Sequence, residues 1–130
     1  IVNTYITDNQ YQPSVDMSAA GDFVVCWCSV GQDGSGAAIV GQRYLSDGTA
    51  LGGEFLVNSH TADNQMRPCI SLNSMGDFMV VWQSENQDGS GWGIYAQLYN
   101  RAPIPEFSTV MVPIALTIAG LTAVRASRRK

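Results

Sequence analysis

Residues 23–28 read FVVCWC and residues 78–83 read FMVVWQ, so one apolar pattern occurs twice in the chain. In an extended strand, successive side chains point to opposite faces. The first stretch is apolar on both faces: one face has Phe23, Val25 and Trp27, and the other has Val24, Cys26 and Cys28. A strand with one solvated face would alternate apolar and polar residues. The pattern therefore predicts strands that are covered on both sides.

These two stretches belong to a longer repeat. A shift of 55 positions aligns residues 1–45 with residues 56–100 without a gap, and 20 of the 45 pairs are identical. The pentapeptide QDGSG, for example, occurs at residues 32–36 and again at 87–91. A period near 50 residues indicates a repeat architecture, in which each unit buries its apolar faces against its neighbours.

Each copy is expected to form four short strands separated by turns rich in Gly and Asp. In the first copy these strands are expected at residues 14–17, 23–28, 39–45 and 54–58. Residues 1–3 match residues 56–58, so the chain starts within a fourth strand that can pair with the second copy across a closure. We predict an all-β domain of two four-stranded antiparallel sheets that resemble β-propeller blades; a β-sandwich and an irregular β-solenoid are the alternatives. Two blades do not close a ring, so their outer faces need another chain or further repeats.

Charge divides the chain into two parts. Residues 1–100 contain two Arg and ten acidic residues, whereas residues 101–130 contain five basic residues and one acid. An acidic body with two cations cannot neutralise many phosphates, which argues against nucleic-acid binding. The cysteines, Cys26, Cys28 and Cys69, are too few for a disulfide scaffold, so we expect free, buried thiols.

The C-terminal part predicts a membrane anchor. Residues 101–106 form a Pro-rich linker, and residues 107–124 are 18 residues without a charge, followed by a basic tail at 125–130. Such a helix is about 27 Å long, close to the thickness of a bilayer core. The basic tail is expected in the cytoplasm and the repeats outside. A buried helix of a soluble domain is the alternative, and Ile1 suggests a removed leader or a longer product.

Two resemblances accompany these observations. The residues Pro105, Glu106 and Phe107, the apolar stretch and the terminal RRK together resemble the PEF-CTERM sorting signal of archaeal surface proteins. This resemblance implies export, cleavage near the motif by an archaeosortase-type membrane enzyme, and attachment to the cell surface. Residues 1–100 resemble tandem repeats of large secreted and surface proteins of bacteria and archaea, whose biochemical role is generally unassigned.

The repeated pentapeptide is the first candidate site. Its carboxylates and hydroxyls, from Asp33, Ser35, Asp88 and Ser90, could contact Ca²⁺ or a sugar. One carboxylate per loop is poor for Ca²⁺, which takes six to eight oxygen ligands. A hairpin turn, in which Asp caps its own loop and Gly takes positive φ, is the favoured interpretation, and we expect no cofactor.

The remaining candidates are aromatic and polar. Trp92 stands where the first copy has Ala37 and could stack on a sugar or fill a gap between units. Trp27 and Trp82 are expected in the core. The repeated Asp-Asn-Gln at residues 8–10 and 63–65 is expected to satisfy loop backbone groups rather than bind a ligand. His60 is the only histidine, so paired-imidazole zinc binding is excluded.

We therefore expect a structural or adhesive β-repeat protein anchored at the cell surface, without enzymatic activity. The alternative is a carbohydrate-binding module in which several chains complete a propeller. The partners implied are the membrane, the processing enzyme, and surface glycans or identical chains.

Overall fold

The computed structural model describes residues 1–100, which form seven β-strands. The strands are β1 (Gln10–Met17), β2 (Phe23–Val30), β3 (Ala37–Tyr44), β4 (Ala50–Leu56), β5 (Gln65–Leu72), β6 (Phe78–Glu85) and β7 (Trp92–Tyr99). These residues contain no helix that could span a membrane. The expected linker (101–106), apolar helix (107–124), basic tail (125–130) and Pro105-Glu106-Phe107 motif lie outside the described residues.

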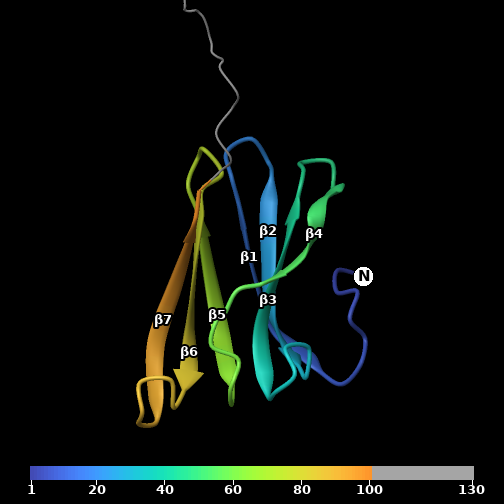
Figure 1. Cartoon of the computed structure of the whole chain (residues 1–130). Helices are drawn as coiled ribbons and strands as arrows, with labels where there is room; N and C mark the ends of the chain where they lie inside the picture. Colours follow the sequence, from blue (N-terminus) through green and yellow to red (C-terminus); the bar gives the residue numbers. More distant parts are fainter. Residues whose placement is uncertain (101–130) are drawn as a thin grey trace, which may run out of the picture.

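The strands form two sheets that lie against each other (Figure 1). The first has the order β1-β2-β3-β4 and the second the order β5-β6-β7, and all neighbouring strands are antiparallel. Each sheet is thus a meander in which consecutive strands pair. The predicted all-β class and antiparallel pairing are confirmed.

The second sheet has three strands among the described residues, where four were expected. The residues that match the end of β4 are the first of the chain, and they form no strand. Figure 1 shows the reason, because the N-terminus lies beside the four-stranded sheet while β7 lies on the opposite flank of the stack. Two stacked sheets do not bring these two ends together.

Both sheets contain the same β-bulge next to a proline. The register shifts between Tyr11 and Ser14 in the first sheet and at the equivalent place in the second, and the residue before each proline takes positive φ, 54° at Gln12 and 58° at Arg67. Proline has no N–H to donate to a ladder, and a bulge removes that requirement. The first strand therefore begins at Gln10, before the proline rather than after it.

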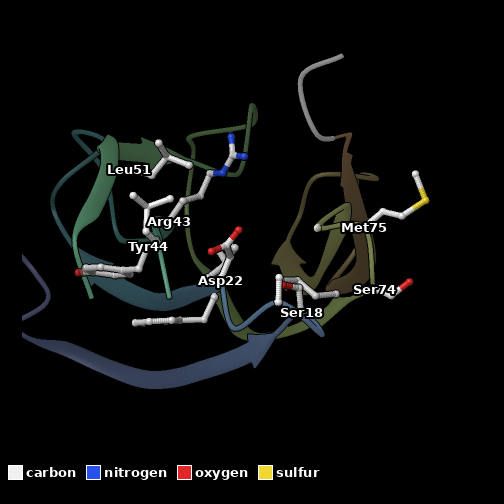
Figure 2. A pocket seen from close by; sticks show the side chains of 13 residues that line it. Ser18, Asp22, Arg43, Tyr44, Leu51, Ser74 and Met75 are labelled. Atoms are coloured by element: carbon white, nitrogen blue, oxygen red, sulfur yellow. The ribbon is translucent and has the colours of Figure 1, made fainter. Parts of the chain in front are cut away.

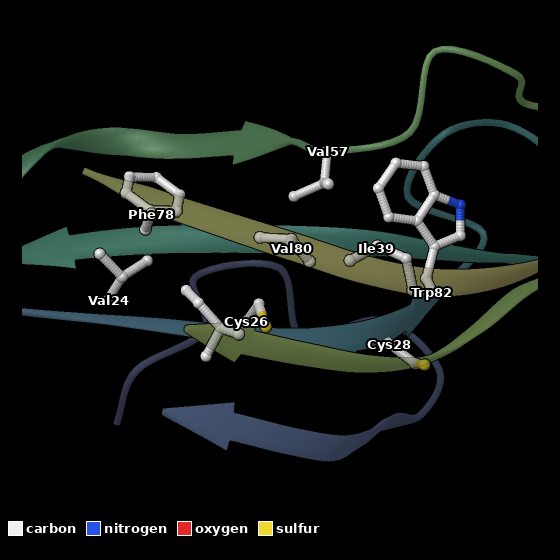
Figure 3. Packing of buried hydrophobic residues seen from close by; sticks show 9 residues of the cluster. Val24, Cys26, Cys28, Ile39, Val57, Phe78, Val80 and Trp82 are labelled. Carbon is white, nitrogen blue, oxygen red and sulfur yellow. The ribbon is translucent and has the colours of Figure 1, made fainter. Parts of the chain in front are cut away.

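The core lies in the seam between the two sheets (Figure 3). Val24, Cys26 and Cys28 project from β2 toward the second sheet, and Phe78, Val80 and Trp82 project from β6 toward the first. The two units therefore bury opposite faces of the repeat. In the first unit the even-numbered residues of β2 face the seam, whereas in the second unit the residues of β6 that correspond to the odd-numbered ones, such as Phe78 for Phe23, face it. This head-to-tail stacking leaves one face of each sheet outside the seam.

The burial of these faces follows from the stacking. Val24 is 4% exposed in the seam, whereas its counterpart Met79, on the outer face of the second sheet, is 42% exposed. Trp27 is buried although it faces outward, and Val2 and Asn3 line a hollow beside it. Trp27 and Trp82 are both buried, as expected. The expectation that both faces of the central strands are covered holds fully only where a neighbouring unit is present.

The cysteines are free, but only two are buried. Burial raises the pKa of Cys26 to about 12 and that of Cys28 to about 11. Cys69 is exposed, contrary to our expectation, because it lies on the side of β5 that faces away from the seam core.

Candidate functional site

Three of the repeated polar segments, which contain Asp33, Asn58 and Asn64, lie at one end of the seam, and Asn58 is central among them. Asn58 is 2% exposed. Its Oδ1 accepts a hydrogen bond from the Ile39 N–H at 2.7 Å, and its Nδ2 donates to Gln65 Oε1 at 3.0 Å and to the His60 carbonyl at 2.9 Å. One amide thereby connects β3 of the first sheet to the start of β5 in the second.

The first pentapeptide loop joins this network. Asp33 Oδ1 accepts from the Ser35 N–H at 3.1 Å, which is the self-capped turn that the sequence favoured. Asp33 Oδ2 accepts from Asn58 Nδ2 at 3.2 Å. Both carboxylate oxygens therefore have partners within the protein, and the loop of the first unit is tied to the second.

The second pentapeptide has only the local half of this arrangement. Asp88 Oδ1 accepts from the Ser90 N–H at 3.2 Å. The two loops lie at the same end of the stack (Figure 1), but no hydrogen bond within residues 1–100 joins them. Trp92, at the start of β7, is 47% exposed. Whether Asp33, Ser35, Asp88, Ser90 and Trp92 bind a ligand stays a prediction.

The repeated Asp-Asn-Gln satisfies loop and edge groups, as expected. Asn64 Oδ1 accepts from the Ala37 N–H at 2.9 Å, and Asn64 Nδ2 donates to Glu85 Oε2 at 2.8 Å. Gln65 Nε2 donates to the Ala62 carbonyl at 2.8 Å. Asn64 thus repeats the function of Asn58, since it connects an N–H at the start of β3 to the second unit.

Gly36 allows Asn64 to approach the start of β3 closely, and replacing Gly36 tests how much this contact stabilises the fold. An added Cβ at Gly36 would collide with Asn64 Oδ1 and come within 2.9 Å of the Asp63 carbonyl oxygen. We expect Gly36→Ala to lower the free energy of unfolding by about 1–3 kcal/mol, because part of the contact is backbone that cannot rotate away. Urea unfolding of the full chain measures it. The control is Gly53→Ala, where an added Cβ meets nothing within 4 Å, and an equal loss in both variants would contradict this account.

A second set of contacts lies along β1 and β5, which are side by side in the seam. Side-chain oxygens of β1 accept hydrogen bonds from backbone N–H groups of β5: Gln12 from Arg67, Ser14 from Ile70 and Asp16 from Leu72. Edge strands carry unpaired N–H groups, and these side chains satisfy them. These residues carry no signal in the sequence, because they are not repeated: the second unit has Arg67, Cys69 and Ser71 instead.

Asp16 makes the stability of the seam dependent on pH. Hydrogen bonds from the Leu72 N–H and then the Met17 N–H hold its pKa below the ordinary value of 3.8. The folded chain therefore binds this proton less readily than the unfolded chain, so the stabilisation is complete above about pH 4 and is lost as the pH falls through the folded pKa. We expect Asp16→Asn to lose less stability than the original chain between pH 5 and pH 2, measured as the urea midpoint. Equal losses would contradict the assignment.

The opposite end of the seam contains a small pocket (Figure 2). It is lined by residues of both units, among them Asp22, Arg43, Leu51 and Met75. The Arg43 guanidinium carbon lies 6.0 Å from the centre of the Phe78 ring, so this cation contributes to packing across the seam. The pocket volume is about 100 Å³, well below the roughly 300–1,000 Å³ of small-molecule sites.

Among residues 1–100, no group of three His, Cys, Asp or Glu side chains is placed to hold a metal ion. No protein-family model, curated protein or solved structure matches the chain. The polar network between the two units is therefore the site on which a function can be argued.

Proposed function

We propose that this protein is a structural or adhesive β-repeat module displayed at the cell surface, with units that stack like propeller blades. The observation that carries this proposal is the set of contacts that the repeated polar side chains make. Asp33, Asn58, Asn64 and Gln65 all belong to repeated motifs, and their side chains join one unit to the next or close a loop. Repeated residues used in this way serve assembly.

The C-terminal sequence supports the location. Residues 107–124 carry no charge and are followed by four basic residues, a pattern typical of a span whose end stays in the cytoplasm. We propose that Pro105, Glu106 and Phe107 are a sorting motif recognised by an archaeosortase-type enzyme, which would replace the apolar segment with a surface attachment. An acidic body with two Arg suits exposure to solvent better than contact with nucleic acid.

The location is tested by digestion of intact cells that carry such a processing enzyme. With tags at both ends, proteinase K added outside is expected to remove the repeat domain, while a chain with Pro105→Ala, Glu106→Ala and Phe107→Ala retains the C-terminal tag that the original chain loses. Protection of the repeat domain in intact cells would contradict surface display. Loss of the C-terminal tag in the triple variant would contradict the motif.

Carbohydrate binding is the second candidate, and the exposure of Trp92 favours it. An aromatic ring that is 47% exposed beside the Asp88-Ser90 turn can stack on a sugar while the turn hydrogen-bonds its hydroxyls. A glycan array with the full chain tests this, and a signal that disappears in Trp92→Ala but persists in Trp82→Phe would support it. No signal in the original chain would exclude it for the glycans present.

A further inference from the structure

We propose that the outer face and free edge of the second sheet bind the N-terminal residues and the outer face of the first sheet of a second copy of this chain. The new contact would reproduce the seam that already joins the two units. The inference rests on the proposed structural role, since it names the partner of the same surfaces.

The outer face of the first sheet has apolar residues at the repeat positions where the second sheet places apolar residues in the seam. The pairs, first unit before second, are Val15 and Ile70, Met17 and Leu72, Phe23 and Phe78, Val25 and Val80, and Tyr44 and Tyr99. Phe23 and Tyr44 stack with ring centres 4.9 Å apart, as Phe78 and Tyr99 do at 4.6 Å inside the seam. One half of a seam is therefore already formed on this face.

The outer face of the second sheet provides the other half. Val24 and Ile39, which line the seam, correspond to Met79 and Ile94 outside it. Ile94 is 74% exposed, and Leu98, which replaces Arg43, is 61% exposed. Exposed apolar side chains that gather on one face typically mark an interaction surface.

The free edge of β7 matches the N-terminal residues in backbone geometry. In the first sheet, the Val57 N–H donates to the Ile39 carbonyl at 2.8 Å, directly after β4. The counterparts of these residues are Val2 and Ile94. Within residues 1–100, β7 has no strand on its outer side, so its unpaired backbone groups can accept an added strand.

Asn3 is already held in the geometry that Asn58 uses. Its Nδ2 donates to the Tyr5 carbonyl and to Gln10 Oε1, both at 2.9 Å, as Asn58 Nδ2 donates to His60 and Gln65. The difference is at Oδ1. Asn58 Oδ1 accepts from the Ile39 N–H, whereas Asn3 Oδ1 accepts nothing from residues 1–100. The matching donor is the Ile94 N–H of a second copy.

The glycine next to β7 leaves room for the same partner. An added Cβ at Gly36 would collide with Asn64, yet an added Cβ at its counterpart Gly91 meets nothing within 4 Å. The residue that matches Asn64 is Asn9, which is exposed. Gly91 is therefore positioned to receive Asn9 of the second copy.

The new contact is not identical to the seam. Gln12, Ser14 and Asp16 accept hydrogen bonds across the seam, but their counterparts in the second unit include Arg67, which cannot accept. We therefore expect the contact between chains to be weaker than the contact within the chain. Because different faces meet, the association is head to tail and forms either a ring or a filament.

Disulfide trapping in the purified full chain tests this proposal. One preparation carries Val2→Cys and another Ile94→Cys, both in a Cys69→Ser background that removes the exposed native thiol. Neighbours across an antiparallel ladder have Cα atoms about 5.5 Å apart, a distance that a disulfide spans. After mixing in a mild detergent and gentle oxidation, we expect a heterodimer of Val2→Cys with Ile94→Cys on a non-reducing gel.

The register provides the matched control. Leu98 lies four residues farther along β7, about 13 Å away, so Leu98→Cys should form about tenfold less heterodimer with Val2→Cys. Asn3→Ala should lower the yield in the matched pair without unfolding the chain. Equal yields from Ile94→Cys and Leu98→Cys, or no heterodimer from either, would overturn the proposal. The assay uses purified chain, so its failure leaves surface display untouched, and failed surface display would not remove the cross-link.

Discussion

Ile39→Asp is expected to unfold the domain, while the matched Ile94→Asp is expected to leave it folded. Ile39 is 0% exposed in the seam and Ile94 is 74% exposed on the outer face, although the two residues occupy the same position in the repeat. A buried, unpaired carboxylate costs several kcal/mol, which is comparable to the roughly 5–15 kcal/mol that stabilises a typical domain. Ile94→Asp should cost about 1 kcal/mol or less. Circular dichroism and urea unfolding of the full chain measure both.

A milder pair keeps this test informative if Ile39→Asp yields no protein. Ile39→Val removes one buried methylene and should cost about 1 kcal/mol, whereas Ile94→Val should cost almost nothing. Equal effects at the two positions would mean that the seam in solution does not use the faces described above.

The second large loss of stability is expected for Asn58→Ala. The substitution leaves the buried Ile39 N–H without an acceptor and removes the donor to Gln65, Asp33 and the His60 carbonyl. A buried donor left unsatisfied costs about 1–3 kcal/mol, and with the lost donors we expect a total near 3 kcal/mol. Thermal unfolding should shift downward by about 10–20 °C for a domain of this size.

Asn3→Ala is the control for this prediction. Asn3 makes the two local hydrogen bonds, but no hydrogen bond from Oδ1 to another unit. We expect a loss of about 1 kcal/mol or less. If Asn3→Ala were as damaging as Asn58→Ala, the local loop rather than the bridge between units would be the source of stability.

Much of the fold could be predicted from the sequence. The apolar residues on both faces of 23–28 indicated a covered strand, and the 55-residue period indicated that a second unit covers it. The Asp-Gly-rich turns also formed where expected, because Asp33 and Asp88 cap their own loops. The turns and the strand pattern depend on local chemistry, and the period is read from the chain as a whole, so neither requires the tertiary structure.

Other features could not be predicted in this way. The proline at position 13 suggested a strand start, but the strand continues through it by means of a bulge. The expected eighth strand is absent from the described residues, since residues 1–3 lie on the opposite flank from β7. The contacts of Gln12 and Asp16 with β5 left no sign in the repeat, because the second unit has different residues at those positions.

The sequence by itself determined that this protein is built from two like units of antiparallel strands, since periodicity, turn residues and duplication are properties of the chain. Only the tertiary structure decided which face of each unit is buried. Ile39 and Ile94 are both isoleucine in the same repeat position, yet one is in the core and the other in solvent. The difference arises because burial depends on the neighbour that stacks on a face, and a repeat has neighbours on both sides only in its interior.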